Sequence, residues 1–137
     1  STIADADDWV FVHDAARPCV TRDCLLKLIG TAIQSNTGAI LAIPVRDTLK
    51  RVISAQDIQE TVDRSQLWQA QTPQIAKLGV LKKAIEHALE VQALITDEAS
   101  ALEFVGEKVQ VVQGRSDNIK ITYPDDLELA RLILAAQ

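Results

Sequence analysis

One carboxylate in this sequence stands where a ligand could reach it. Asp14 comes just after a continuous apolar run, Trp9–Val12, which is typical of a strand covered on both faces, as in parallel α/β sheets. The small residues Ala15 and Ala16 leave room for a ligand, and a carboxylate can bind a hard cation such as Mg²⁺. Asp14 also fits a turn-capping residue or a phosphate-accepting nucleophile, and this feature alone does not separate the three.

Two cations and two hydroxyls further along the chain could bind a phosphorylated substrate. Arg64 offers a bidentate fork and Lys120 a point charge, and both suit a phosphate group. Thr72 and Thr96 are expected in a loop or at a helix start, where free backbone N–H groups favour anions. Taken singly, each of the four also fits an ordinary surface charge or a helix N-cap.

Several other classes of site lack their motifs. The chain has no P-loop, no Gly-x-Gly-x-x-Gly and no Gly-x-Ser-x-Gly, and its five glycines form no loop that could surround a phosphate. Cys19 and Cys24 stand five positions apart without a second pair. That spacing favours reduced thiols over a disulfide framework or a zinc site.

Composition narrows the function further. The 137 residues fit one domain, and 47% of them are hydrophobic, which is typical of a soluble globular protein. Fourteen basic and nineteen acidic residues give a net charge of −5, which argues against a general nucleic-acid binder. No apolar run approaches the length that crosses a bilayer. We therefore expect a cytoplasmic protein that binds neither nucleic acid nor membrane.

Strand and helix patterns alternate along most of the chain. The periodicity predicts helices over about 21–33, 80–89, 97–104 and from 124 onward, and strands over 9–12, 39–45, 108–112 and 119–121. This alternation favours an α/β sheet with helices on its faces. Ligands bind such sheets at the carboxyl ends of the strands, and Asp14 lies at one of these ends.

The segment from Arg46 to about Ala70 departs from this alternation. Its mixed polar pattern predicts a hairpin, followed by a short strand over Leu67–Gln71. A polar hairpin has little apolar surface to bury by itself. We therefore expect it to pack on something else, such as another subunit.

Seven short motifs in this order resemble a known family. They are residues 12–18 (VHDAARP), 44–48 (PVRDT), 61–64 (TVDR), 67–68 (LW), 72–74 (TPQ), 96–103 (TDEASALE) and 118–120 (NIK). Together they resemble the motif series of the 2-C-methyl-D-erythritol 4-phosphate cytidylyltransferases of the non-mevalonate isoprenoid pathway, over essentially the whole chain. The resemblance implies an α/β fold: an incomplete Rossmann-like nucleotidyltransferase sheet with a protruding β-hairpin arm.

The resemblance also shows a departure. Members of this family begin with a strand and a glycine-rich loop that grips the CTP triphosphate, and this sequence contains neither. We therefore expect residues 1–137 to be the C-terminal part of a single nucleotidyltransferase domain. We expect this chain alone to be inactive or nearly so.

The implied reaction is attack of the phosphate of methylerythritol phosphate on the α-phosphorus of CTP, with release of pyrophosphate. The hairpin at about 46–64 would reach across a homodimer, so that Thr48 and Arg64 serve the partner's site. The resemblance implies that Asp14 binds Mg²⁺ and that Ala15 contacts the substrate. It implies that Arg17, Thr72 and Thr96 orient the sugar alcohol. It also implies that the catalytic residues Arg64 and Lys120 position the phosphate, with help from Thr48.

Two other functions stay open at this point. The missing triphosphate loop fits a truncated, non-catalytic module that dimerises through the hairpin. The same cations and threonines fit a cytidylyltransferase for another polyol phosphate, such as ribitol phosphate.

Overall fold

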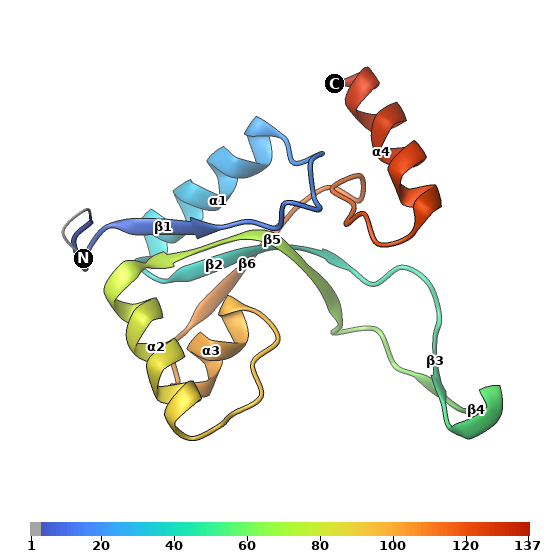
Figure 1. Cartoon of the computed structure of the whole chain (residues 1–137), viewed down its shortest axis with the longest axis horizontal. Coiled ribbons are helices and arrows are strands. Elements are labelled where there is room, and N and C mark those ends of the chain that lie inside the picture. The colour runs from blue at the N-terminus through green and yellow to red at the C-terminus, as the bar shows by residue number, and fades with distance from the viewer. Residues whose placement is uncertain (1–3) are drawn as a thin grey trace.

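The computed structural model describes residues 4–137, apart from the side chain of Ala55, as an α/β fold (Figure 1). Six strands, four α-helices and one short 3-10 helix are defined in this range. In chain order they are β1 (Trp9–Val12), α1 (Arg22–Ser35), β2 (Gly38–Pro44), β3 (Leu49–Val52), η1 (Ser54–Gln56), β4 (Ile58–Val62), β5 (Trp68–Lys77), α2 (Leu78–Glu90), α3 (Glu98–Phe104), β6 (Val109–Gln113) and α4 (Pro124–Ala136).

The main sheet has four strands in the order β1-β5-β2-β6. Strand β5 runs antiparallel to both of its neighbours, whereas β2 and β6 are parallel, so the sheet is mixed. Helix α1 covers one face, and α2 and α3 cover the other (Figure 1). The predicted α/β class is confirmed.

Helix α1 begins and ends where its sequence specifies. The Thr21 hydroxyl accepts a hydrogen bond from the N–H of Cys24 at 3.4 Å, and Asn36 ends the helix in the left-handed conformation at φ 54°. Its buried stripe includes Leu28 and Ala32, which pack against the sheet at Leu41. This packing holds the loop between β1 and α1, and therefore Asp14, over the end of the sheet.

Helices α2 and α3 pack on the opposite face. Leu81 of α2 and Leu102 of α3 share a buried cluster with Ala76 of β5. Asp97 begins α3 with a capping box, because its carboxylate accepts from the N–H of Ser100 while the Ser100 hydroxyl accepts from the N–H of Asp97. The first turn of α3 is thereby fixed beside β5.

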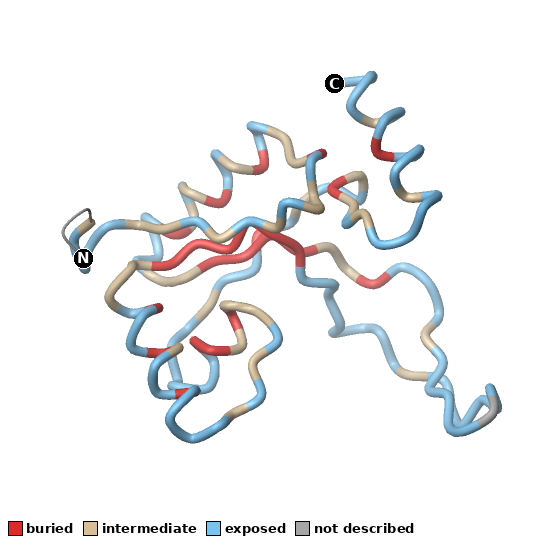
Figure 2. Tube along the Cα trace, viewed as in Figure 1, coloured by how far each residue is buried: buried red, intermediate tan, exposed pale blue. Residues whose placement is uncertain are grey.

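Strands β3 and β4 form a separate two-stranded sheet that extends away from the main sheet (Figure 1). We call residues 46–64 the arm. Figure 2 shows that the arm is largely exposed, whereas buried residues gather in the central strands. Large apolar side chains of the arm are more than half exposed, at 54% for Val52, 53% for Ile53 and 62% for Ile58. The predicted hairpin is confirmed.

Three details differ from the sequence predictions. Strand β1 lies at an edge of the described sheet, antiparallel to β5, and its cover is incomplete: Trp9 and Val10 pack against clusters on opposite faces, but Phe11 is 41% exposed. Strand β5 is ten residues long rather than a short strand over 67–71, and Pro73 lies within it. A register shift in β2 between Ile40 and Ala42 faces this part of β5, and at such an irregularity a proline without an N–H is tolerated.

The third difference concerns residues 119–121, which were predicted as a strand and form a loop instead. The N–H of Ile121 donates to the carbonyl of Ala16 at 2.8 Å. This segment therefore crosses to the β1–α1 loop instead of joining a strand ladder, and it brings Lys120 toward Asp14.

Candidate active site

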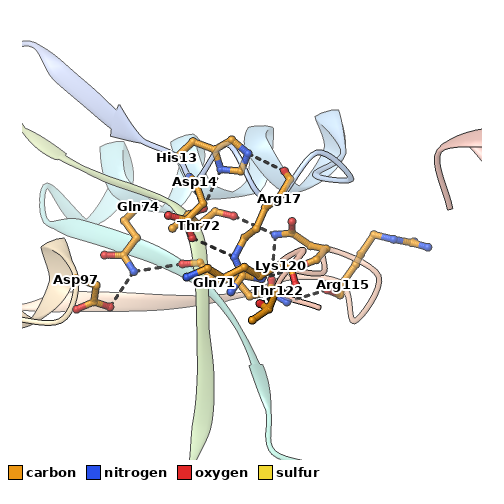
Figure 3. A network of polar contacts seen from close by, with 11 residues as sticks. His13, Asp14, Arg17, Gln71, Thr72, Gln74, Asp97, Arg115, Lys120 and Thr122 are labelled. Atoms are coloured by element: carbon orange, nitrogen blue, oxygen red, sulfur yellow. Dashed lines mark hydrogen bonds and ion pairs between the residues drawn. The ribbon is translucent and has the colours of Figure 1, made fainter. Parts of the chain in front are cut away.

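Five of the predicted site residues line one cleft of about 340 Å³. They come from four separate segments: the β1–α1 loop, strand β5, the turn before α3 and the loop after β6. Figure 3 shows Asp14, Arg17, Thr72 and Lys120 among them. The five are Asp14, Arg17, Thr72, Thr96 and Lys120. Thr72 lies within β5 rather than in a loop, where the sequence had placed it.

Thr72 is fixed by the loop that carries Asp14. Its hydroxyl oxygen accepts a hydrogen bond from the N–H of Asp14 at 2.9 Å. His13 Nε2 lies 2.9 Å from the carbonyl of Arg17, which can only accept, so Nε2 donates. In the neutral imidazole, Nδ1 is then the acceptor for the Thr72 hydroxyl, 2.9 Å away. A remaining lone pair of the Thr72 oxygen can accept from a substrate hydroxyl.

Sequence reasoning missed His13. His13 stands in the first of the seven motifs, but no role was predicted for it. In the structure it joins Thr72 of β5 to Arg17 of its own loop. The signal in the sequence was its place directly before Asp14, but its partner Thr72 is 59 residues away.

Arg17 is held at the edge of the cleft. Its side chain is 14% exposed, its Nη1 donates to the carbonyl of Asn118 at 2.7 Å, and its Nε lies 3.5 Å from Asp14 Oδ2. The Asp14 side chain is 40% exposed, so its carboxylate faces solvent as well as Arg17. This pair places a cation and an anion side by side at the cleft mouth.

Lys120 is exposed at the same edge. Within residues 4–137 its ammonium group makes no ion pair with a carboxylate. A lysine in this state can bind a phosphate group without first giving up a protein partner.

The opposite wall is built on a buried amide. Gln74 is 3% exposed, and its Nε2 donates to Asp97 Oδ2 at 2.9 Å while its Oε1 accepts from the N–H of Ala99 at 2.9 Å. These bonds tie β5 to the start of α3, and Thr96 lies just before that start. Gln74 was part of a recognised motif, but nothing in the sequence indicated this contact.

Hydrogen bonds lower the pKa values of two nearby carboxyls. Arg115 donates two hydrogen bonds to Asp117, at 2.9 and 2.8 Å, and this holds the pKa of Asp117 below its usual range. The N–H groups of Tyr123 and Thr122 donate to Asp126, which lowers the pKa of that carboxyl. The loop that carries Lys120 is thus bounded by two carboxylates that stay ionised.

The predicted cysteine chemistry is consistent with the structure. Cys19 and Cys24 are both free and buried. Burial raises the pKa of the Cys19 thiol, which therefore stays protonated.

The other three predicted site residues do not line this cleft. Ala15 lies in the same loop as Asp14 and is exposed. Thr48 and Arg64 belong to the arm, and Arg64 Nη1 donates to the carbonyl of Val45 at 3.2 Å. Their predicted roles in a partner's site stay predictions.

The described residues hold no group of three or more His, Cys, Asp or Glu side chains that could bind a metal ion. The cleft does contain Asp14, with Asp97 and Glu98 on the other wall. One or two carboxylates are sufficient for Mg²⁺ when substrate phosphates and water supply the other ligands. The donor set therefore fits a metal that arrives with a nucleotide.

The family model described as IspD, 2-C-methyl-D-erythritol 4-phosphate cytidylyltransferase, matches residues 1–136. This chain belongs to that family. The resemblance noted from the seven motifs is confirmed.

Relatives in the cytidylyltransferase family cover this chain almost completely. The 2-C-methyl-D-erythritol 4-phosphate cytidylyltransferase of Acinetobacter baumannii strain SDF is 72% identical over 137 residues, which are 100% of this chain and 58% of the relative. The enzyme of the same name from Photobacterium profundum is 54% identical, over 98% of this chain and 59% of the relative. The chain thus spans less than two thirds of the length of these relatives.

Solved structures of the family share the fold. A Francisella tularensis 2-C-methyl-D-erythritol 4-phosphate cytidylyltransferase matches with a TM-score of 0.88 and 42% identity, covering 97% of this chain and 62% of that one. The Thermus thermophilus structure of the same name matches with a TM-score of 0.85 and 32% identity, covering 94% of this chain and 62% of that one. In the part of the chain that the structure describes, no helix is both long and apolar enough to span a membrane.

Proposed function

We propose that this chain supplies the acceptor side of a cytidylyltransferase that transfers CMP from CTP to 2-C-methyl-D-erythritol 4-phosphate. The observation that carries the proposal is the cleft itself. Five of the site residues predicted from the motifs come from four segments and line one cavity of about 340 Å³. None of the relatives described above is named for ribitol phosphate or for a non-catalytic role, so we do not favour those alternatives.

The proposed reaction requires little covalent participation of the protein. An oxygen of the acceptor phosphate attacks the α-phosphorus of CTP, the bond between the α- and β-phosphates breaks, and pyrophosphate leaves with the bonding electrons. Such a reaction depends on positioning and on neutralising charge. Lys120 neutralises and positions the acceptor phosphate, and Arg17, Thr72 and Thr96 bind the hydroxyls of the sugar alcohol.

Asp14 is the residue that would hold Mg²⁺, whose charge would offset that of the triphosphate. Its carboxylate is 40% exposed at the cleft and close to Arg17. Arg17 also fixes the position of that carboxylate, because its own guanidinium is bound to the loop at Asn118.

We further propose a homodimer in which the arm reaches the partner's cleft. The arm does not line its own cleft, and it exposes Val52, Ile53 and Ile58 to solvent. In such a dimer Thr48 and Arg64 add a hydroxyl and a cation to the partner's phosphate site. The composition and the cysteine usage support a cytoplasmic location for this enzyme.

The donor triphosphate needs a binding loop that this sequence does not contain. We therefore propose negligible turnover for residues 1–137 alone. For the experiments below, the full-length enzyme means this chain fused behind the preceding part of the Acinetobacter baumannii relative, which is 72% identical to it.

Pyrophosphate release tests the function. The full-length enzyme, supplied with CTP, Mg²⁺ and methylerythritol phosphate, should release pyrophosphate, and ribitol phosphate should be a much poorer acceptor. Lys120→Ala should lower kcat/KM for the acceptor by about 100-fold or more, as expected for a group that stabilises charge on phosphate. Lys82→Ala, an exposed lysine of α2, is the matched control and should leave kcat/KM unchanged. Near-normal activity of Lys120→Ala, or a preference for ribitol phosphate, would refute the proposal.

A further inference from the structure

Three segments that carry cleft residues meet at one buried side chain. Asn118 is 1% exposed and lies in the loop after β6, two residues before Lys120. Its side chain donates to the carbonyl of Thr72 in strand β5, and its backbone carbonyl accepts from Arg17 of the β1–α1 loop. Asn118 begins the motif at residues 118–120, but the resemblance assigns it no role, and it does not itself line the cleft.

The orientation of the Asn118 amide follows from its partners. The side-chain atom 3.0 Å from the carbonyl of Thr72 must be a donor, so it is Nδ2. The same nitrogen lies 3.3 Å from Gln71 Oε1. Gln71 is fixed in turn, because its Nε2 donates to the carbonyl of Arg115 at 3.0 Å.

The packing around Gln71 leaves little freedom. A Cβ atom on residue 114 would come within 2.7 Å of Gln71 Oε1, so Gly114 allows the close approach of β6 to this side chain. The loop from Gly114 to Lys120 is thereby joined to β5 by two amide side chains, Gln71 and Asn118. Its outward movement would break both sets of hydrogen bonds.

If the Asn118 side chain only filled space, an amide would be a destabilising choice at this position. Asn118 Oδ1 is buried and has no hydrogen-bond partner among the described residues. Burial of an unpaired polar atom destabilises a fold, and an apolar side chain of similar size would avoid that loss. A leucine at this position could not donate the hydrogen bond that Asn118 Nδ2 makes to the carbonyl of Thr72.

The geometry points to Asn118 as a positioning residue for the acceptor phosphate and sugar. It sets the spacing of Lys120, Thr72 and Arg17 relative to one another, and it acts through them because it does not touch the substrate. This inference rests on the proposed function of the same cleft. It predicts an effect on the acceptor and not on CTP, since all three residues are on the acceptor side.

The test compares Asn118→Asp and Asn118→Ser in the full-length enzyme. Asp keeps the shape but replaces the donating Nδ2 by an oxygen, and Ser removes the link without burying a charge. Ser keeps the experiment informative if the Asp variant does not fold. Leu28→Val, in the α1 core, is the control for a general loss of stability. All variants are assayed well below their Tm.

We expect kcat/KM for the acceptor to fall by about 10- to 100-fold in both Asn118 variants, because small misplacements in a reaction site have effects of this size. KM for CTP should change by less than about twofold, as should all parameters of Leu28→Val. In a Lys120→Ala background, Asn118→Ser should lose most of its effect, since coupled residues are not additive. A purely structural role would give additive effects.

Binding of inorganic phosphate, followed by NMR on the full-length enzyme, separates this inference from the proposed function. Asn118→Ser should weaken phosphate binding whether or not the enzyme turns over. If the parent enzyme is inactive and phosphate binding still weakens, the proposed function fails and the positioning role stands. If the parent is active and Asn118→Ser behaves like Leu28→Val in every assay, the positioning role is refuted.

Discussion

The cleft floor and the arm both depart from the usual pattern of a folded protein, in which apolar side chains are buried and polar ones exposed. The cleft floor, which consists of three lining residues and the Asn118 side chain bonded to two of them, buries polar groups: Gln71, Thr72, Gln74 and Asn118 are between 1% and 8% exposed. The arm exposes apolar ones, with Ile58 at 62%. Buried polar groups and exposed apolar groups are the two departures that carry functional information.

This difference indicates which interactions hold each region in its conformation. The cleft floor is held together within the chain, because each buried amide makes hydrogen bonds to other segments. Among the described residues, the hydrogen bonds of the arm lie within its own hairpin and at its base, where Asp63 and Arg64 contact neighbouring backbone groups. The cleft therefore has a defined shape in one chain, whereas the arm gains its buried surface from a second copy in our proposal.

The largest effect should come from breaking the cleft floor. Gln74→Leu leaves the N–H of Ala99 and the carboxylate of Asp97 without their partner. Unmade buried hydrogen bonds destabilise by about 1–3 kcal/mol each, so we expect a loss of about 2–3 kcal/mol in the free energy of unfolding, allowing for the partial exposure of Asp97. Urea denaturation measures it. Gln69→Leu, at an exposed position on the same strand, is the control. An equal loss of stability in that variant would show that the buried hydrogen bonds of Gln74 are not the cause.

An intermediate effect should come from the arm, and it should appear in assembly and not in stability. Ile58→Ser should change the free energy of unfolding of the monomer by less than about 0.5 kcal/mol, because the side chain is already exposed. It should weaken dimerisation by about tenfold or more, as expected when a buried isoleucine is lost from an interface.

Sedimentation equilibrium of the full-length enzyme measures this effect. Gln59→Ser, the exposed neighbour, serves as the control. A monomeric parent, or a dimer indifferent to Ile58→Ser, would remove the arm's proposed role.

The smallest effect concerns acid stability. The folded-state pKa of Asp117 is lowered, chiefly by hydrogen bonds from Arg115, and that of Asp63 is lowered, chiefly by the N–H of Ser65. A lowered pKa contributes stability above the unfolded-state value, and this contribution is lost as pH falls through about 5 to 3.

The contributions of Asp117, near the cleft, and Asp63, in the arm, should differ in size. We expect Asp117→Asn to flatten the dependence of the urea midpoint on pH in this window. Asp63→Asn should flatten it less, because the arm lies outside the packed core. Equal behaviour of the two variants would show that the two regions unfold as one unit.

Helices and the arm were predictable because their signals are local. Thr21 begins α1, Asp97 begins α3 and Pro124 begins α4, and each is recognisable from its neighbours in the sequence. The arm was predictable because its polar alternation could not build a core. Strand β5 was not, since Pro73 interrupts its pattern and its buried side chains include polar ones.

The candidate site divides in the same way. The order of the motifs selected Asp14, Arg17, Thr72, Thr96 and Lys120, and all five line one cleft. The residues that hold them, His13, Gln74 and Asn118, stand in the same motifs, but nothing in the sequence indicated which residues they contact. The contacts of His13 with Thr72, Gln74 with Asp97 and Asn118 with Thr72 join positions 59, 23 and 46 residues apart, and such separations leave no mark on local periodicity.

By itself, the sequence determined the α/β class, the arm, and the family through its ordered motifs, because caps, periodicity and motif spacing act over short stretches of chain. Only the tertiary structure decided that β5 runs through Thr72 as the centre of a mixed sheet. Only it brought the loop of Asn118 and Lys120 back against the β1–α1 loop. The physical reason is that a buried polar side chain must find its partner in space, and the partner's place along the chain is unconstrained.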